Sequence, residues 1–256
     1  MIQSTLPRTA RPTRARRASR ILLAVAAMAA LLGVDLPDAA AVPPLGITAQ
    51  ARPGATADRV GALFTEGLDG GHFCTAAVVH SEDRDVIATA AHCLESPETT
   101  VFAPGYRDGK APYGVWKLTE VYIAPGWTDG QDPDDDIAFA TVAPAGAGRS
   151  GAVEDLVGGF PVAAEQPDEA TATVIGYPRT EESPLRCANT TDLLTESQRR
   201  IGCPDLTGGT SGSPWLVGGA LAGVLGGYEG GGSVPEISYS AVLGDEAVDL
   251  YRQARS

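Results

Sequence analysis

The amino-acid sequence predicts an all-β protein made of two antiparallel barrels and closed by a C-terminal helix. The first observation is composition: the 256 residues include 31 Gly and 19 Pro, and no long apolar-periodic stretch follows residue 40. Such a chain is typical of short strands joined by turns. The second observation is that the apolar runs fall into two halves, each with two of the four Cys residues. The third is that only the last segment has helical periodicity.

The first 41 residues predict an export signal. Six Arg residues lie between positions 8 and 20, ahead of the 14-residue apolar run 21–34, and small residues follow up to Ala41. A basic head, an apolar middle and an A-x-A end are typical of a signal peptide, here cleaved after Ala41. A transmembrane anchor is disfavoured, because spanning a bilayer takes about 20 residues. We expect a secreted, extracellular protein; the sequence leaves open whether export follows the Sec or the twin-arginine route.

The next segments predict a leader and the first barrel. Residues 42–59 are rich in Pro, Ala and Gly and indicate an extended N-terminal leader. The first barrel is assigned to residues 60–147, with strand candidates at 60–64, 73–79, 85–92, 114–123 and 136–142. The Pro/Ala/Gly stretch 143–152 predicts the crossing to the second barrel.

The second barrel and the closing helix are assigned to residues 148–256. Strand candidates lie at 169–178, 213–229 and 236–243. In the segment 245–255, apolar residues recur at three- and four-residue spacing, acidic residues come first and Arg comes last. This pattern predicts the C-terminal helix.

The four cysteines indicate two disulfides. An even number of Cys in an exported chain favours disulfides, and nearest-neighbour pairing gives Cys74–Cys93 and Cys187–Cys203. The sequence alone permits three connectivities. A zinc site is the alternative, but the chain has no C-x-x-C pair and only three His residues, so we expect no metal.

The charge balance excludes two classes of partner. Removing the signal takes six Arg and two Asp from 19 basic and 32 acidic residues, which leaves a formal charge of −17. So acidic a protein has no electrostatic reason to bind nucleic acid or anionic membranes. We expect no nucleic-acid partner, no membrane association after signal cleavage, and a monomer.

The segment "TAAHC" (89–93) places a histidine next to a cysteine, just after an apolar strand. A general base must be fixed so that its ring meets a nucleophile at hydrogen-bond distance, and a bridged Cys93 would clamp His92 at its base. The alternative is an ordinary core histidine. His72 and His80 lie at the edges of loops and are expected to be surface residues.

An acidic cluster, "DPDDDIAFA" (132–140), precedes another strand. The last acid, Asp136, is carried inward by that strand, and a buried carboxylate can orient a His ring and stabilise its protonated form. One alternative is a solvated loop. Another is a calcium site built on Asp129, Asp132 or Asp134, although the loop lacks the spacing of a known calcium loop.

The glycine-rich segment "TGGTSGSPW" (207–215) contains Ser211. A surface turn has a similar composition, so this segment does not identify a nucleophile on its own. His92, Asp136 and Ser211 nevertheless follow each other in chain order as a base, an acid and a hydroxyl. These three residue types together can perform acyl transfer.

"TAAHC", "DDDIAF" and "GGTSGSPW" resemble the three active-site segments of the chymotrypsin-like, or trypsin-like, serine peptidases. The likeness continues in "VIGYP" (174–178) and "LAGVLGGYE" (221–229), and it covers most of residues 60–255. It is closest to secreted bacterial members, including the glutamyl-endopeptidase-like branch. The resemblance implies two six-stranded barrels with the site in the cleft between them. It also implies protein or peptide substrates, and we expect no cofactor.

The resemblance also implies roles for these residues. His92 is the general base, Asp136 orients its ring, and Ser211 is the nucleophile that forms an acyl-enzyme. The backbone N–H groups of Gly209 and Ser211 form the oxyanion hole, which requires a glycine-rich turn.

Thr210 departs from the pattern of the trypsin branch, where an aspartate precedes the nucleophile and pairs with a new N-terminus. Thr210 cannot form that ion pair, and the chain lacks an "IVGG" segment. "RVGALF" (59–64) is a possible substitute, but Val60 is expected to lie in the first strand already. We therefore predict an oxyanion hole that forms without insertion of an N-terminus.

The residues that set specificity are harder to identify. Asp205 falls where trypsin-like members carry the aspartate at the floor of the primary pocket, which would select Arg or Lys. The alternative is that Asp205 caps a loop near the second disulfide. Glutamate specificity is disfavoured because no basic residue lies between 201 and 251. Gly226 and Tyr228 are expected to line the pocket and to pair with the substrate backbone.

The main hypothesis is therefore a secreted serine endopeptidase with a preference for Arg or Lys before the scissile bond. The rival hypothesis is a pseudopeptidase, a secreted binding module that kept the fold and lost turnover. All three triad residues and the glycine turn are retained, which argues against the rival. The missing trypsin-like activation features argue for it, since a triad is defined by geometry rather than by residue identity.

Overall fold

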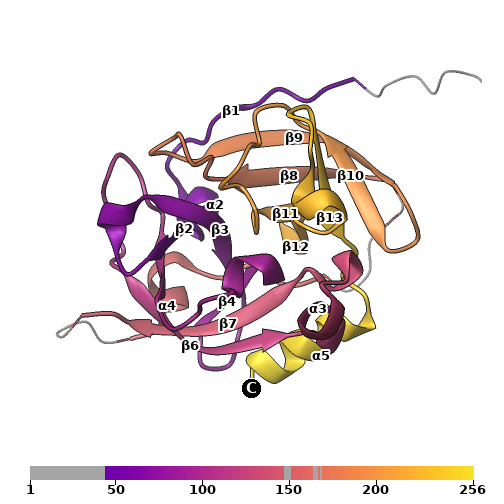
Figure 1. Cartoon of the computed structure of the whole chain (residues 1–256). Helices are drawn as coiled ribbons and strands as arrows, with labels where there is room; N and C mark the ends of the chain where they lie inside the picture. Colours follow the sequence, from indigo (N-terminus) through magenta and orange to yellow (C-terminus); the bar gives the residue numbers. More distant parts are fainter. Residues whose placement is uncertain (1–43, 147–150, 164–166, 168) are drawn as a thin grey trace, which may run out of the picture. The chain divides into compact units, whose positions relative to one another are not determined.

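The computed structural model describes residues 44–146, 151–163, 167 and 169–256, and the predicted export signal lies outside them. In this part of the chain, no helix is long and apolar enough to cross a membrane. The described residues are mostly β-structure and form two sheets, which Figure 1 shows in indigo to pink and in orange to yellow. The predicted all-β class with a C-terminal helix is confirmed.

The first half forms a closed antiparallel barrel of six strands in the order β2-β3-β4-β7-β6-β5. These strands are β2 (Val60–Thr65), β3 (His72–Val78), β4 (Val86–Thr89), β5 (Thr100–Pro104), β6 (Trp116–Ile123) and β7 (Ala138–Pro144). They bury many alanines together with a few large side chains, including Phe102, Trp116 and Phe139. Mixing small and large side chains fills the interior of a narrow barrel.

Short helical segments connect these strands. They are α2 (Ala55–Asp58), η1 (Leu68–Gly70), η2 (Ala91–Leu94), α3 (Pro125–Gly130) and η3 (Pro133–Asp135). One residue separates η2 from the end of β4, and two residues separate η3 from the start of β7, so both lie at strand ends.

The second half forms a sheet in the order β12-β11-β8-β9-β10-β13. Its strands are β8 (Ala170–Gly176), β9 (Leu185–Leu193), β10 (Gln198–Gly202), β11 (Pro214–Val217), β12 (Ala220–Val224) and β13 (Ile237–Ala241). The end strands β12 and β13 share no ladder of hydrogen bonds, so this half is an incompletely closed barrel. They still pack closely, because a Cβ on Gly223 would lie 2.3 Å from the Ser240 hydroxyl. The core behind them includes Val174, Ile201 and Trp215.

Both halves contain one disulfide, with the pairing that neighbouring cysteines predict. Cys74–Cys93 joins β3 to η2 with a Cα–Cα distance of 6.1 Å. Cys187–Cys203 joins β9 to the residue after β10, with a Cα–Cα distance of 5.9 Å. The first disulfide therefore fixes η2 to β3, and the second fixes the residue after β10 to β9.

The strand predictions were incomplete. The segment 213–229 is not one strand but a hairpin, in which Gly218 and Gly219 turn the chain with φ of +60° and +87°. Such left-handed conformations are accessible to glycine at little cost. Strands β5, β9 and β10 were not predicted at all.

The leader is part of the folded unit. Its short strand β1 (Ala49–Gln50) pairs with β9 of the second sheet, and Gly46 N–H donates to Gly202 O at 2.8 Å. The chain then enters α2 and β2 of the first barrel. The leader therefore connects the two halves.

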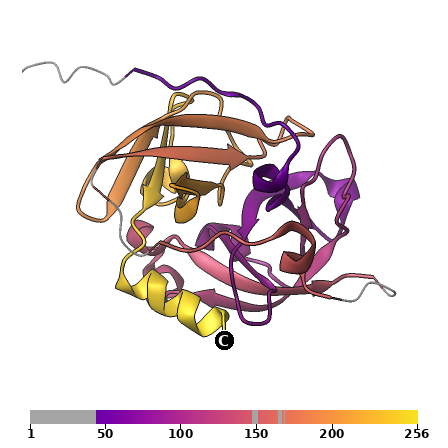
Figure 2. The same cartoon turned by 180° about the vertical axis from the view of Figure 1, so that it is seen from behind.

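The segments around the crossing and at the C-terminus contact the first barrel. α4 (Val153–Val157) lies there, and Glu154 N–H donates to Arg84 O at 3.0 Å. The C-terminal helix α5 (Asp245–Ala254) runs along β6 and β7 in Figures 1 and 2. Its Tyr251 hydroxyl donates to His80 O at 2.6 Å. The C-terminal helix therefore packs on the first barrel, although it follows the second sheet in the sequence.

Candidate active site

The three candidate catalytic residues lie on segments that meet between the two sheets. His92 is in η2, and Asp136 lies between η3 and β7, both in the first barrel. Ser211 lies in the turn 207–213, which leads into β11 of the second sheet. The turn contacts the first barrel directly, because Thr75 N–H of β3 donates to Ser211 O at 2.7 Å.

The His92 ring is paired with a buried carboxylate. Its Nδ1 lies 2.7 Å from Oδ2 of Asp136, and the backbone N–H of His92 donates to Oδ1 at 2.9 Å. The N–H of Gly227 donates to Oδ2 at 2.8 Å. With three donors, the carboxylate of Asp136 is satisfied although the residue is only 1% exposed. Because Nδ1 carries the shared proton, Nε2 is left as the acceptor on the partly exposed ring.

Close packing maintains this pair. The disulfide of Cys93 anchors η2 beside β3, and the ring of Trp127 lies 6.2 Å from the His92 ring. On the other side, a Cβ on Gly226 would lie 2.7 Å from Oδ2 of Asp136. A glycine is therefore needed at 226 so that the second sheet can approach the carboxylate.

The Ser211 turn is packed against the segment that precedes His92. A Cβ on Gly212 would lie 2.1 Å from Thr75 O and 2.2 Å from Thr89 Oγ1. Gly212 also has φ of +79°, a conformation that L side chains rarely adopt. The glycine after Ser211 therefore allows close contact with β3 and the end of β4.

In the turn 207–213, the backbone N–H groups of Gly209 and Ser211 have no hydrogen-bond acceptor among the described residues. Arg179 N–H donates to Gly208 O at 2.7 Å, and Ser213 N–H donates to Thr210 O at 2.9 Å. Each peptide unit is planar and trans, so the N–H groups of Gly209 and Ser211 point away from these bonded carbonyls. Between 209 and 213, only these two N–H groups lack an acceptor among the described residues. Two unpaired, preorganised donors in one turn are suited to bind a negatively charged oxygen.

A cavity of about 220 Å³ opens beside Ser211. Besides Ser211 itself, its lining consists of Leu206, Thr207, Gly208, Thr210, Leu225, Gly230, Gly231, Gly232, Ser233, Val234 and Pro235. None of these side chains is ionisable, so the cavity is uncharged.

The sequence model of the Trypsin family matches residues 48–240, which include the whole of this site. The chain belongs to the trypsin family of serine peptidases. The resemblance carried by the three motifs is thereby confirmed.

Solved structures of trypsin-like proteases have the same fold. The protease Anisep from Arthrobacter nicotinovorans is 26% identical, with a TM-score of 0.70 over 82% of this chain and 99% of that one. The thermostable serine protease AL20 from an extremophilic microorganism is 29% identical, with a TM-score of 0.67 over 79% and 99%. A Glu endopeptidase is 17% identical, with a TM-score of 0.65 over 84% and 98%, and shows the fold alone. No curated protein sequence matches the chain.

Thr210, the residue before Ser211, is hydrogen-bonded within its own turn. Its side chain is 1% exposed, and its hydroxyl donates to Thr207 O at 2.7 Å. Val60, the possible new N-terminus, is completely buried in β2, and Val78 N–H donates to the preceding Arg59 O at 2.8 Å. Hydrogen bonds within the turn therefore hold Thr210 in place. The segment around Val60 is an uncut strand that pairs with its neighbours β3 and β5.

The predicted specificity residues do not line the cavity beside Ser211. Asp205 is exposed, has φ of +66°, and donates its N–H to Pro235 O at 3.1 Å. Gly226 lies against Asp136, and Tyr228 is 44% exposed with its ring 5.1 Å from that of Tyr239. The lining of this cavity begins at Leu206, the residue after Asp205.

The prediction for His72 was wrong. His72 is 3% exposed, and its Nε2 donates to Glu181 O at 3.0 Å. Its ring packs edge-on against Phe64 and Tyr177, with centroid distances of 5.7 and 5.8 Å. His72 begins β3 rather than ending a loop, and this strand carries it inward. His80 is exposed, as predicted.

Two polar residues that support the site were missed by sequence reasoning. Thr75 follows Cys74 and is completely buried. Gln198 in β10 is 3% exposed, and its amide donates to Pro133 O at 2.9 Å and accepts from Tyr228 N–H at 3.0 Å. Gln198 thus links the loop before Asp136 to the segment after Gly227. Thr75 could have been suspected from the sequence, because it is the one polar residue in the apolar strand motif "FCTAAVV" (73–79).

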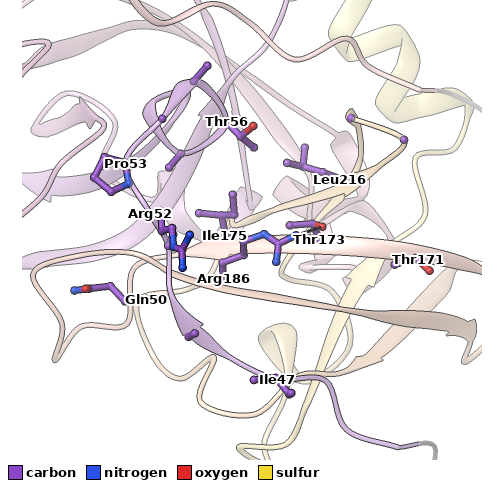
Figure 3. A pocket seen from close by; sticks show the side chains of 17 residues that line it. Ile47, Gln50, Arg52, Pro53, Thr56, Thr171, Thr173, Ile175, Arg186 and Leu216 are labelled. Atoms are coloured by element: carbon purple, nitrogen blue, oxygen red, sulfur yellow. Dashed lines mark hydrogen bonds between the residues drawn. The ribbon is translucent and has the colours of Figure 1, made fainter.

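A larger cavity of about 740 Å³ lies elsewhere, and Figure 3 shows it. It separates leader residues 47–57 from the face of β8, β9 and β11 that bears Thr173, Arg186 and Leu216. None of the candidate catalytic residues lines it. Cavity size therefore does not locate the site in this fold.

Proposed function

We propose that this chain is a secreted serine endopeptidase that hydrolyses peptide bonds through an acyl-enzyme. One observation carries the proposal: His92, which is paired with Asp136, closely follows residues 89–90, on which the Ser211 turn packs, and in this turn the N–H groups of Gly209 and Ser211 are unpaired among the described residues. Membership of the trypsin family supports the same reaction class. The two disulfides support secretion, because such bonds persist in oxidising compartments.

In the first half of the proposed reaction, Ser211 Oγ attacks the carbonyl carbon of the scissile bond. The hydroxyl proton passes to Nε2 of His92, and Asp136 stabilises the resulting imidazolium through Nδ1. The carbonyl oxygen becomes an oxyanion, which accepts hydrogen bonds from the N–H groups of Gly209 and Ser211. In serine peptidases in general, each such donor lowers the barrier by about 3 to 4 kcal/mol.

In the second half, the imidazolium gives its proton to the leaving amine, and the carbon–nitrogen bond breaks. The acyl group remains on Ser211 as an ester. Water then attacks this ester, with His92 again taking a proton, and the acid product leaves with Ser211 restored.

We further propose that the residue before the scissile bond is uncharged. The cavity beside Ser211 has no ionisable side chain: apolar side chains such as Leu206, Leu225 and Val234 line it together with Thr, Ser and Gly residues. The earlier expectation of Arg or Lys depended on Asp205, which is exposed outside this cavity. An acidic side chain contacts the lining of this cavity: Glu229 accepts a hydrogen bond from the Ser233 hydroxyl. The Glu229 side chain is itself exposed to solvent. An exposed carboxylate is screened by water and selects a cation only weakly.

A fluorophosphonate probe tests the reaction class. We expect the wild-type chain to be labelled and Ser211→Ala to remain unlabelled, because the probe reacts only with an activated nucleophile. Ser213→Ala is the matched control, since its buried hydroxyl lies in the same turn and has no hydrogen-bond partner in the described part of the chain. Equal labelling of wild type and Ser211→Ala would refute the proposal. Absence of any labelling in the folded protein would favour the pseudopeptidase.

Matched peptides that differ only at the residue before the scissile bond test specificity. We expect kcat/KM for Leu or Phe to exceed that for Arg or Glu by about tenfold or more, because a buried unpaired charge loses hydration without compensation. A preference for Arg that disappears in Glu229→Gln would assign selection to the rim acid instead. A preference for Arg that persists in this variant would contradict the uncharged cavity.

A further inference from the structure

Thr75 connects the first barrel to the glycine-rich turn of the second sheet. It lies in β3 directly after Cys74 and is completely buried. Its hydroxyl donates to Gly209 O at 3.0 Å and accepts from Tyr177 N–H at 2.9 Å. Its backbone N–H donates to Ser211 O at 2.7 Å. One residue therefore contacts both positions whose N–H groups are unpaired.

We propose that Thr75 is a positioning residue that keeps the oxyanion turn in its open, anion-binding form. The proposal rests on the proposed serine peptidase function. Thr75 touches neither the substrate nor the reacting atoms; it acts through the backbone of Gly209 and Ser211.

The turn needs such a tether because it is rich in glycine. Gly208, Gly209 and Gly212 leave its peptide units with little steric restraint, and Gly209 adopts φ of +103°. Rotation of one peptide unit would turn a carbonyl oxygen into the space where the oxyanion is to bind. The hydrogen bond from the Thr75 hydroxyl fixes the Gly209 carbonyl, and the bond from Arg179 N–H fixes the Gly208 carbonyl.

The hydroxyl of Thr75 also positions the segment 177–179, against which the turn packs. A Cβ on Gly209 would lie 2.5 Å from Arg179 N and 2.6 Å from Tyr177 O. Because Tyr177 N–H donates to the same hydroxyl that binds Gly209 O, one oxygen atom joins this segment to the turn. The Thr75 side chain is thus the point at which three segments meet.

Thr210 explains why the tether comes from the first barrel. In the trypsin branch, an aspartate at this place holds the turn by an ion pair with the inserted N-terminus. Thr210 donates its hydroxyl and its N–H to Thr207 O and accepts from Ser213 N–H, and because these bonds all lie within its own turn, they do not anchor the turn to the rest of the molecule. The turn is instead linked to the first barrel by Thr75, through its side chain and its backbone N–H.

Removing the hydroxyl leaves two buried groups without partners. In Thr75→Val, the side chain keeps its shape, while Gly209 O and Tyr177 N–H lose their hydrogen bonds. Thr75→Ser keeps the hydroxyl and loses only a methyl group. Thr100→Val is the matched control: Thr100 lies in β5, is 3% exposed, and its hydroxyl donates to one backbone carbonyl, that of Ser96, at 2.9 Å.

Steady-state kinetics on peptide substrates, with a peptide boronate as a tetrahedral mimic, provide the test. We expect Thr75→Val to lower kcat by about 100-fold with KM within about twofold, because removing an oxyanion-hole donor from a serine peptidase has effects of about this size. Boronate affinity should fall by a similar factor. Thr75→Ser should stay within about threefold of wild type, since its hydroxyl can restore both bonds. Thr100→Val should lose stability without losing kcat.

A kcat for Thr75→Val that equals that of Thr100→Val would overturn the proposal, and so would an equal loss in a folded Thr75→Ser. If Thr75→Val does not fold, Thr75→Ala provides the same comparison without the bulk of the methyl groups. If the wild type hydrolyses no peptide, the proposed function fails, yet the role of Thr75 remains testable. Amide exchange at Thr210 and Ser213, whose N–H groups are hydrogen-bonded within the turn, should then accelerate in Thr75→Val relative to Thr100→Val, and unchanged exchange would reject the role.

Discussion

Asp136 is buried and receives three hydrogen bonds. Two come from His92 and one from Gly227 N–H, which belongs to the second sheet. The carboxylate therefore fixes the imidazole tautomer and also joins the two halves of the molecule at the candidate site. All three partners are N–H donors, so both oxygens of residue 136 must accept hydrogen bonds. Among side chains, only a carboxylate offers two oxygens that both accept.

Asp136→Asn replaces one acceptor oxygen with a donor NH2 group of almost the same size. We expect kcat to fall by about 10⁴-fold with little change in KM, because the His92 ring is then held in the wrong tautomer. Peptide hydrolysis at neutral pH measures the change. Asp129→Asn, an exposed acid in α3, should leave kcat unaltered. Retention of more than a tenth of the activity in Asp136→Asn would contradict the orienting role.

Asp135 is the neighbouring acid with a perturbed titration. Burial, together with the charges of Glu246, Asp132 and Asp134, raises the pKa of Asp135 above its usual range. A raised pKa means that the folded state binds the proton more tightly than the unfolded state does. Ionised Asp135 therefore destabilises the fold at neutral pH, and this penalty disappears as the pH falls through the folded-state pKa.

Asp135→Asn should accordingly raise the free energy of unfolding at pH 7 by up to about 1 kcal/mol, a limit set by its partial exposure. The gain should shrink as the pH falls below the folded-state pKa. Urea unfolding at several pH values measures this, with exposed Asp129→Asn as the reference. A gain that grows toward acid pH would reverse the sign and disprove the assignment.

At the scale of single elements, β2 is complete without any cleavage of the chain. Val60 is fully buried at its start, and Gly105 N–H donates to Val60 O at 2.9 Å. The side chain of Arg59 lies over the Phe160 ring at 5.1 Å. A cut between Arg59 and Val60 would free the start of β2, a strand that pairs with β3 on one side and with β5 on the other.

Arg59→Gln should therefore leave peptide hydrolysis intact in a chain of residues 42–256. We expect kcat within about twofold of wild type and a small loss of stability from the missing cation–π contact, about 0.5 to 1 kcal/mol. Rates are measured together with the N-terminal sequence of the active species. Arg52→Gln, in the same leader, serves as the control. If Arg59→Gln were folded and inactive, and if activity appeared only after a cut at residue 59, then activation would require a new N-terminus.

Strands β9 and β10 show why some elements cannot be read from the sequence. β9, "LRCANTTDL", buries only Cys187 and Thr191, and β10, "QRRIG", buries Gln198 and Arg199 with Ile201. Their side chains give no apolar alternation, because many polar groups are exposed or hydrogen-bonded. The ladders to β8 and β13 define these strands, and they are contacts between distant residues.

At the scale of the whole molecule, the two halves are interlocked at both ends of the described chain. The leader pairs with the second sheet before it enters the first barrel, and α5 leaves the second sheet to cover the first barrel. Tyr251 is central to this contact, with its ring 5.5 Å from that of Phe139. We therefore expect the two halves to unfold in one transition.

Tyr251→Ala should lower the free energy of unfolding by about 3 to 5 kcal/mol, as truncation of a buried aromatic side chain does. Tyr251→Phe should lose only about 1 kcal/mol, the contribution of the hydrogen bond to His80 O. Calorimetry should show a single transition for the wild type and for both variants. A separate transition of the second half in Tyr251→Ala would show that the halves fold independently.

The sequence alone determined the fold class, the family, the disulfide pairs that adjacent cysteines suggest, and the candidates for base, acid and nucleophile. Each is encoded in short contiguous motifs, in which a few neighbouring residues and a flanking strand carry the signal. Only the tertiary structure decided which residues line the cavity beside Ser211, that His72 is buried, and that the second barrel remains open. It also revealed the Thr75–Gly209 contact, whose partners are 134 positions apart. Such features depend on which distant backbone groups meet, and local periodicity carries no information about that.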